Sequence, residues 1–78
     1  VIDVRGQKVE DAIAKLETQL DAAALNDESR VKIVHGHGTE TLKKAVRAHL
    51  SRSVYVKKWK AALPETGGDG VTWAELKD

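Results

Sequence analysis

The chain contains no cysteine, methionine or phenylalanine, and it has a single proline among its 78 residues. Without cysteine, disulfide bonds and thiolate metal sites are excluded, which favours a reducing, cytoplasmic location. No apolar run approaches the roughly 18 residues of a membrane span, and no signal peptide is visible, so we expect no membrane contact. The start at Val1 and the lack of methionine indicate a piece of a larger protein.

Charge is unevenly distributed along the chain, although the formal net charge is only +1. Between Arg30 and Lys60 lie nine basic residues and one acid, Glu40, whereas the remainder carries four basic residues and eleven acids. In a single domain spanning residues 1–78, this segregation favours one face that binds a polyanion. The alternative is that the basic residues form ordinary solvated faces of helices and strands.

The apolar periodicity predicts two helices and four strands. We expect strands at residues 1–4, 31–34, 54–59 and 71–76, helices at 9–25 and 41–50, and a loop at 61–69. The order β-α-β-α-β-β contains two successive β-α-β units with right-handed crossovers, so both helices should cover one face of the sheet. The predicted fold class is α/β, a two-layer sandwich in which a four-stranded mixed sheet carries two helices on one face.

A glycine-rich segment, His35-Gly36-His37-Gly38-Thr39, separates the strand at 31–34 from the helix at 41–50. Glycines between a strand and a helix let backbone N–H groups approach an anion, so the segment is interpreted as a phosphate-binding loop. Arg5-Gly6 ends the first strand. The carboxyl ends of parallel strands lie at one edge of a sheet, where open α/β sheets bind ligands. We therefore expect the two segments to lie together.

Asp3 and Arg5 lie two residues apart on the first strand, so both should point away from the face of Ile2 and Val4. Two interpretations are open. The structural one is an ion pair between the two side chains, or a hydrogen bond between the carboxylate and loop backbone. The functional one is a carboxylate that activates water or binds a divalent cation, beside an arginine that holds a phosphate.

The three histidines are candidates of different kinds. His35 could act as a general acid or base, or hold a phosphate when protonated, or shape the turn through a bond to loop backbone. With His37 it forms a weak His-x-His metal motif that lacks an evident third ligand. His49 falls on the apolar stripe of the second helix and is interpreted as a core residue.

Basic and aromatic residues outside the loop are further candidates. Lys43, Lys44 and Arg47 lie off the apolar stripe of the second helix, toward solvent or a partner, where they could contact neighbouring phosphates. Trp59 and Trp73 could stack on bases, but in a core without phenylalanine or methionine we expect them to serve packing.

Three segments together resemble the motifs of the small MutS-related (Smr) domain. Ile2-Asp3-Val4-Arg5-Gly6 is similar to its Leu-Asp-Leu-His/Arg-Gly motif, and residues 35–39 are similar to its His-Gly-x-Gly-Thr-Gly motif. Residues 67–72, Gly-Gly-Asp-Gly-Val-Thr, resemble its late Gly-Gly-x-Gly-Val-Thr stretch. They occur in the family's order and spacing over nearly the whole chain. Arg5, where many relatives have histidine, resembles the version at the C-terminus of the second bacterial MutS lineage, the endonuclease MutS-like proteins.

The resemblance implies a fold like the C-terminal domain of translation initiation factor three, attached to upstream ATPase domains. It implies nicking endonuclease activity on DNA and, in some relatives, binding or cleavage of RNA, with roles in recombination control or rescue of collided ribosomes. The residues that match its motifs are assigned to catalysis or to the phosphate-binding loop: Asp3, Arg5 and His35 to the first, and Gly36, His37, Gly38 and Thr39 to the second.

One residue departs from the family's pattern. Glu40 stands where the family usually has the last glycine of its loop motif. A carboxylate there suits the start of a helix, but it would repel a phosphate placed at the same helix start. Glu40 therefore points away from the site, or joins Asp3 in binding a cation, or weakens the site.

The leading hypothesis is a module that nicks the nucleic-acid backbone with little sequence preference. Arg5 and the loop would hold the phosphate, and Asp3 would activate water directly or through a divalent cation such as Mg²⁺ or Mn²⁺. The main alternative is a non-catalytic module that docks the parent protein on structured RNA, the ribosome or branched DNA. A protein-interaction or dimerisation domain is the third. The sequence decides neither between DNA and RNA nor which metal would bind.

Overall fold

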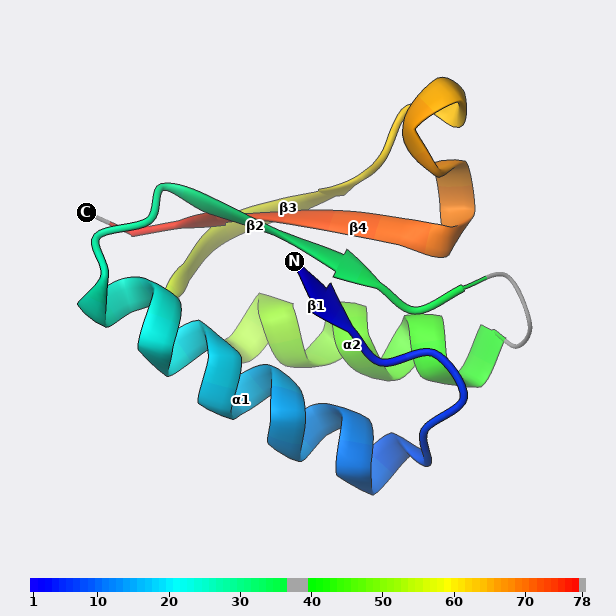
Figure 1. Ribbon diagram of the computed structural model, residues 1–78, viewed down its shortest axis with the longest axis horizontal. Helices are drawn as coiled ribbons and strands as arrows, with labels where there is room; N and C mark the ends of the chain where they lie inside the picture. Colours follow the sequence, from blue (N-terminus) through cyan, green and yellow to red (C-terminus); the bar gives the residue numbers. More distant parts are fainter. Residues whose placement is uncertain (37–39, 78) are drawn as a thin grey trace.

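The computed structural model describes residues 1–36 and 40–77. Four strands and two long helices follow one another along the chain: β1 (Ile2–Asp3), α1 (Val9–Leu25), β2 (Arg30–Val34), α2 (Glu40–Arg52), β3 (Val56–Ala61) and β4 (Val71–Leu76). Two short 3-10 turns, η1 (Pro64–Thr66) and η2 (Gly68–Gly70), connect β3 to β4. The order of the strands and long helices along the chain is the predicted one (Figure 1).

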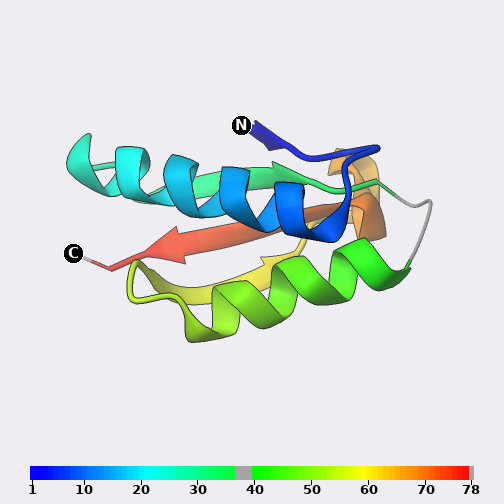
Figure 2. The same cartoon turned by 90° about the horizontal axis from the view of Figure 1, so that it is seen from below.

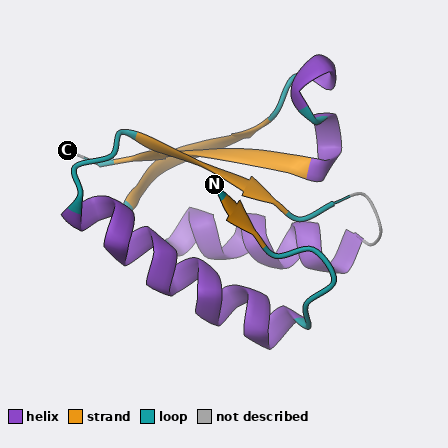
Figure 3. Cartoon of the chain, in the orientation of Figure 1, coloured by secondary structure: helices purple, strands orange, loops and turns teal. Residues whose placement is uncertain are grey.

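The strands form one mixed sheet in the order β1-β2-β4-β3. β1 runs parallel to β2, whereas β4 runs antiparallel to both of its neighbours, β2 and β3. α1 and α2 lie side by side against one face of this sheet (Figure 2), and colouring by secondary structure shows the same two layers (Figure 3). The predicted two-layer α/β sandwich is therefore confirmed.

The two helices pack on the sheet through apolar stripes whose residues recur at three- and four-residue steps. The buried members are Ala12, Leu16, Leu20 and Ala23 in α1, and Leu42, Val46 and Leu50 in α2. α1 has its predicted bounds, whereas α2 is longer than predicted at both ends. In the part of the chain that the structure describes, no helix is long and apolar enough to cross a bilayer.

Two strands differ from prediction at their ends. β1 is only two residues long, although the N–H of Val4 still donates to the carbonyl of Val34 at 2.9 Å. β3 begins at Val56 rather than at residue 54 and continues to residue 61. Its start is delayed because the Ser53 hydroxyl accepts the N–H of Tyr55 at 3.2 Å, which forms a turn and not an extended strand.

The predicted loop between β3 and β4 contains the two short turns, and they are tied to the end of β2. Gly67 separates η1 from η2 with a φ of 118°, and a Cβ at this position would clash with the Val71 side chain. The carbonyl of Gly70 accepts the N–H of His35 at 3.1 Å and that of Gly36 at 2.9 Å. The ends of β1 and β2 and the turn η2 therefore form one edge of the molecule, which we call the loop edge.

Candidate functional site

Asp3 and Arg5 form a two-pronged ion pair at the loop edge. Arg5 Nη2 lies 2.7 Å from Asp3 Oδ2, and Arg5 Nε lies 3.0 Å from Asp3 Oδ1. The backbone N–H of Arg5 also donates to Asp3 Oδ1 at 3.0 Å. Both side chains reach solvent, and the hydrogen bonds from Arg5 lower the pKa of the Asp3 carboxyl to about 2. The carboxylate is therefore ionised at physiological pH, and the structural interpretation of this pair is realised.

The Arg5 side chain also lies over the start of the glycine-rich loop. Gly36 has a φ of 79°, and a Cβ at this position would come within 3.3 Å of Arg5 Cγ. Glycine is therefore needed at residue 36 both for its left-handed backbone and for this close approach. The two segments that the sequence places at one sheet edge do meet. The predicted loop residues His37, Gly38 and Thr39 lie outside the described residues.

His35 is buried and both of its ring nitrogens have partners. Nε2 lies 2.8 Å from the Thr72 hydroxyl oxygen, and Nδ1 lies 3.2 Å from the carbonyl oxygen of Gly36. A carbonyl can only accept a hydrogen bond, so we infer that Nδ1 carries the ring proton and that Nε2 accepts the proton of Thr72. The Thr72 hydroxyl in turn accepts the Nε–H of Arg47 at 3.0 Å.

The surroundings of His35 favour the neutral imidazole. Burial lowers its pKa, and the nearby charges of Arg47 and Lys43 lower it further, while the Gly36 carbonyl and Asp69 raise it in part. A neutral, hydrogen-bonded imidazole in this position joins the end of β2 to β4 and α2. Of the roles open to His35, shaping the turn is the one that the geometry favours.

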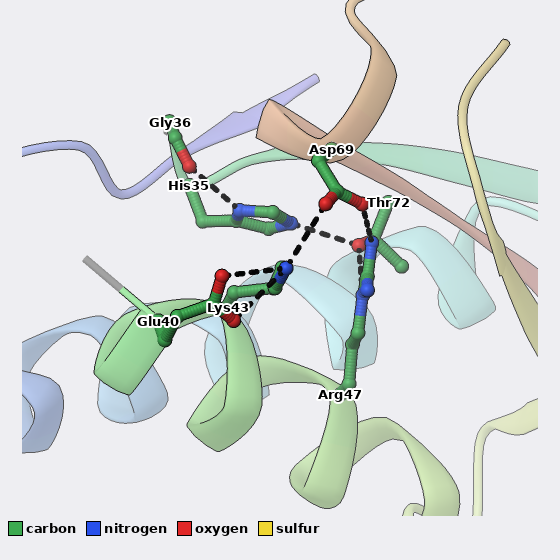
Figure 4. A network of polar contacts seen from close by, with 7 residues as sticks. All are labelled: His35, Gly36, Glu40, Lys43, Arg47, Asp69 and Thr72. Carbon is green, nitrogen blue, oxygen red and sulfur yellow. Dashed lines mark hydrogen bonds and ion pairs between the residues drawn. The ribbon is translucent and has the colours of Figure 1, made fainter. Parts of the chain in front are cut away.

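A cluster of four charged residues, which we call the cation cluster, lies beside His35 (Figure 4): Glu40, Lys43, Arg47 and Asp69. Lys43 Nζ lies 3.1 Å from Asp69 Oδ2 and 3.0 Å from Glu40 Oε2. Lys43 donates hydrogen bonds to both carboxylates, and these bonds, first the one to Glu40 and then the one to Asp69, raise the pKa of Lys43. The Lys43 and Arg47 side chains are only 14% and 17% exposed, so α2 presents two nearly covered positive charges toward η2.

Arg47 has several partners but keeps one unused donor. Its guanidinium carbon lies 5.1 Å from the centre of the Trp59 ring, and its Nη2 lies 3.8 Å from Asp69 Oδ1. Nη2 is buried and has no hydrogen-bond partner among the described residues. A buried guanidinium N–H without a hydrogen-bond partner is energetically costly, and the nearby Asp69 carboxylate offsets part of that cost.

Two residues of this site were not predicted from the sequence. Thr72 joins His35 to Arg47, and Asp69 pairs with Lys43 and Arg47 of α2. Both residues belong to the Gly-Gly-x-Gly-Val-Thr stretch, and Thr72 also stands out as a hydroxyl on the inward face of β4. Lys44 is exposed, as predicted, and does not join the cation cluster. His49 lies partly buried on α2, with Nε2 3.3 Å from Glu17 Oε1.

The described residues hold no preformed cluster of metal ligands. They contain no group of three or more histidine, aspartate or glutamate side chains that could hold a metal ion. Both oxygens of Asp3 accept hydrogen bonds from Arg5. Three interpretations of Glu40 were open. Its ion pair with Lys43 on the same helix favours a carboxylate that points to this neighbouring cation and not to Asp3.

Comparison with known proteins identifies the family of this chain. The sequence profile of the Smr domain matches residues 2–77. The chain is 42% identical over 76 residues to the endonuclease MutS2 of Staphylococcus haemolyticus, and 45% identical over 76 residues to that of Staphylococcus carnosus. Both alignments cover 97% of the chain. The chain spans only 10% of the length of these relatives, so the activity of the whole relatives is not transferred to it directly.

Two solved structures have the same fold. The Smr domain of Thermus thermophilus MutS2 superposes with a TM-score of 0.96 at 34% identity, covering 99% of this chain and 96% of that one. YdaL, a stand-alone small MutS-related protein from Escherichia coli, superposes with a TM-score of 0.85 at 24% identity, covering 97% of this chain and 64% of that one. At that identity the second likeness concerns the fold alone. On the profile match and the match to a solved Smr domain, this chain belongs to the Smr domain family.

Proposed function

We propose that this domain binds the nucleic-acid backbone at the loop edge and nicks DNA there. The observation that carries the proposal is the close approach of the Arg5 side-chain stem to Gly36, which places an exposed arginine beside the start of a glycine-rich loop at the ends of two parallel strands. Relatives that are 42% to 45% identical over this region are named endonuclease MutS2, which supports the reaction class.

In this proposal Arg5 holds the scissile phosphate. Its Nε and Nη2 are bonded to Asp3, whereas Nη1 makes no hydrogen bond to the described residues. A guanidinium fixed along one side and open along the other is oriented for a phosphate oxygen, and it loses little conformational freedom on binding. The backbone N–H groups of the loop would share the charge of the phosphate.

Asp3 has two roles in the proposed reaction. It orients Arg5, and it accepts a hydrogen bond from the attacking water, which places the water beside the phosphorus. As the water oxygen bonds to phosphorus, the bond from phosphorus to one sugar oxygen breaks; the water gives up its proton to solvent, and solvent protonates the leaving sugar oxygen. With a pKa near 2, the carboxylate removes a proton poorly at neutral pH, so its contribution is positioning more than general base catalysis. His35 is buried and neutral, and it supports the loop through Gly36 while Thr72 links it to Arg47.

The test is nicking of supercoiled plasmid by the domain, with Arg5→Ala and Asp3→Asn measured beside the parent. Arg52→Ala is the matched control, because Arg52 is exposed at the opposite end of α2. We expect loss of nicking for the first two variants and parental nicking for the control. Equal nicking by all four proteins would contradict the assignment. Repeating the assay with EDTA, Mg²⁺ and Mn²⁺ shows whether a divalent cation takes part.

A second function is favoured by the pairing of charges. Asp3 pairs with Arg5, and Glu40 and Asp69 pair with Lys43 and Arg47, so each of these cations already lies beside a carboxylate. Such an arrangement suits a module that docks a larger protein on branched DNA, structured RNA or the ribosome without cleaving it. Salt-sensitive binding without nicking under any divalent cation would support this alternative.

The cellular setting belongs to the same proposal. We place the domain in the cytoplasm, attached to upstream ATPase domains of a MutS-like protein, with a role in recombination control or ribosome rescue. The lack of cysteine supports the location, and the relatives, which are about ten times longer than the matched region, support the attachment to other domains. Lys44 would contact a neighbouring phosphate from its exposed position on α2.

A further inference from the structure

The face of the sheet opposite the helices carries a cluster of basic residues around one tryptophan. Val31 and Ile33 of β2 are buried toward the helices, so Arg30 and Lys32 point to the other face. The register places Trp73 beside Lys32 on one side and beside Lys60 on the other.

A second pair of register positions completes this open face. Glu75 of β4 lies opposite Arg30 and Lys58, and its carboxylate is 3.4 Å from Lys58 Nζ. We use the name open face for the surface formed by six residues: Arg30, Lys32, Lys58, Lys60, Trp73 and Glu75. It therefore carries four positive charges and one negative charge. Both long helices lie on the other side of the sheet (Figures 1 and 2).

The tryptophan of this face is set for stacking. The guanidinium of Arg30 lies 4.9 Å from the centre of the Trp73 ring, which is a cation–π contact. A hollow of about 290 Å³ adjoins the pair and is lined by Arg30, Lys60, Ala61, Ala62, Leu63 and Trp73. Trp59, in contrast, is paired with Ala74 on the helix side, where its Nε1 donates to Ser51. The two tryptophans therefore face opposite sides of the sheet.

We propose that the open face binds an unpaired DNA strand, with a base stacked on the Arg30–Trp73 pair and phosphates held by Lys32, Lys58 and Lys60. A four-stranded sheet with an aromatic side chain between cations is a known way to bind single strands, because every base offers a π-face for stacking. A protein partner is disfavoured, since lysine is depleted at the cores of protein interfaces. A paired duplex keeps its bases stacked inside and offers none to Trp73.

The open face is continuous with the loop edge. Trp73 lies two residues from Val71 on β4, Val71 pairs with Val34, and Val34 pairs with Asp3. With strands about 4.8 Å apart and a rise of about 3.4 Å per residue, the Cα atoms of Trp73 and Asp3 are roughly 12 Å apart. A strand held at Trp73 therefore reaches the Asp3–Arg5 pair within a few nucleotides. The choice of DNA over RNA rests on the proposed function.

The test measures binding of a short oligothymidylate by fluorescence anisotropy at low salt. Trp73→Leu should weaken binding about tenfold or more, and Trp73→Phe should retain most of the affinity, because it keeps an aromatic face. The double variant Lys32→Gln, Lys60→Gln should make the log–log salt slope shallower by about 1.4, whereas the control Arg52→Gln should leave the affinity near that of the parent. Thermal unfolding of each variant excludes loss of fold as the cause.

A second measurement reads the stacking directly. The chain has two tryptophans, so Trp59→Phe leaves Trp73 as the only indole, and oligothymidylate should quench its emission. Parental affinity in Trp73→Leu, or unquenched Trp73 emission at saturation, would overturn the proposal. Tighter binding of oligouridylate or of duplex DNA would overturn the assignment to a DNA strand. Plasmid nicking is measured separately, so a domain that binds through Trp73 but never nicks refutes the proposed function alone.

Discussion

The Thr72 hydroxyl is expected to be the most sensitive single group of the site. Its residue is fully buried, with 0% exposure, and it accepts the Nε–H of Arg47 while donating to His35 Nε2. Thr72→Val preserves the shape and the β-branch but removes both hydrogen bonds. It leaves a charged donor and a ring nitrogen buried without a partner.

The expected loss follows from those two groups. An unsatisfied buried polar group costs about 1–3 kcal/mol, and more if it is charged, so Thr72→Val should lower the free energy of unfolding by about 2–4 kcal/mol. A domain of this size is stable by roughly 4–12 kcal/mol, so the loss is a large fraction of the total. Chemical denaturation followed by circular dichroism measures it.

Thr18→Val is the matched control for this experiment. Thr18 is exposed on α1, and within the described part of the chain its hydroxyl donates only to the Ala14 carbonyl of its own helix, at 3.1 Å. We expect a change within about 0.5 kcal/mol for this surface substitution. If Thr72→Val were as stable as Thr18→Val, the Thr72 hydroxyl would not be the shared partner of His35 and Arg47.

Two further predictions concern charge. Asp69→Asn removes the carboxylate that lies between Lys43 and Arg47. Nucleic acid should therefore bind several-fold more tightly at low salt, as measured by fluorescence anisotropy. Unchanged affinity would show that the phosphate binds away from these two residues. The pKa of His35 is lowered in the folded chain. As the pH falls through the ordinary histidine range near 6.5, the unfolded chain therefore binds more protons than the folded chain, and the folded state loses stability. The melting temperature should therefore decrease as the pH is lowered from 7.5 to 5.5, and this decrease should be smaller in His35→Phe. An equal decrease in both proteins would refute the role of His35 in this pH dependence.

The sequence predicts those features that depend on local pattern. α1 follows from an uninterrupted apolar stripe and has its predicted bounds. β3 starts later than predicted because a turn stabilised by the Ser53 hydroxyl precedes the strand. Val54, which is apolar, lies in this turn and is 76% exposed. Apolar identity alone does not reveal that a neighbouring hydroxyl satisfies a backbone N–H, so the end of a strand is harder to predict than its middle.

The site is predictable where it depends on topology. Parallel strands bring Arg5 and the glycine-rich loop to one edge, and the contact of Arg5 with Gly36 agrees with that reasoning. The pairing of Lys43 with Asp69 joins residues 26 positions apart and depends on the course of the turn η2. That course is set by the positive φ of Gly67, a backbone state that the residue type permits but does not specify.

The pairing of Asp69 has a consequence for how the site would respond to a phosphate. A phosphate that approaches Lys43 and Arg47 must compete with a carboxylate that they already bind, so its net gain is smaller than for unpaired cations. Asp69 is followed directly by Gly70, whose carbonyl accepts the N–H groups of His35 and Gly36. Displacement of Asp69 would therefore be transmitted to the glycine-rich loop. Under the proposed function the cation cluster would therefore contribute little affinity, and most of the affinity would come from other surfaces. Among the described residues, the open face carries four positive charges and one negative charge, so it is the surface we expect to supply that affinity.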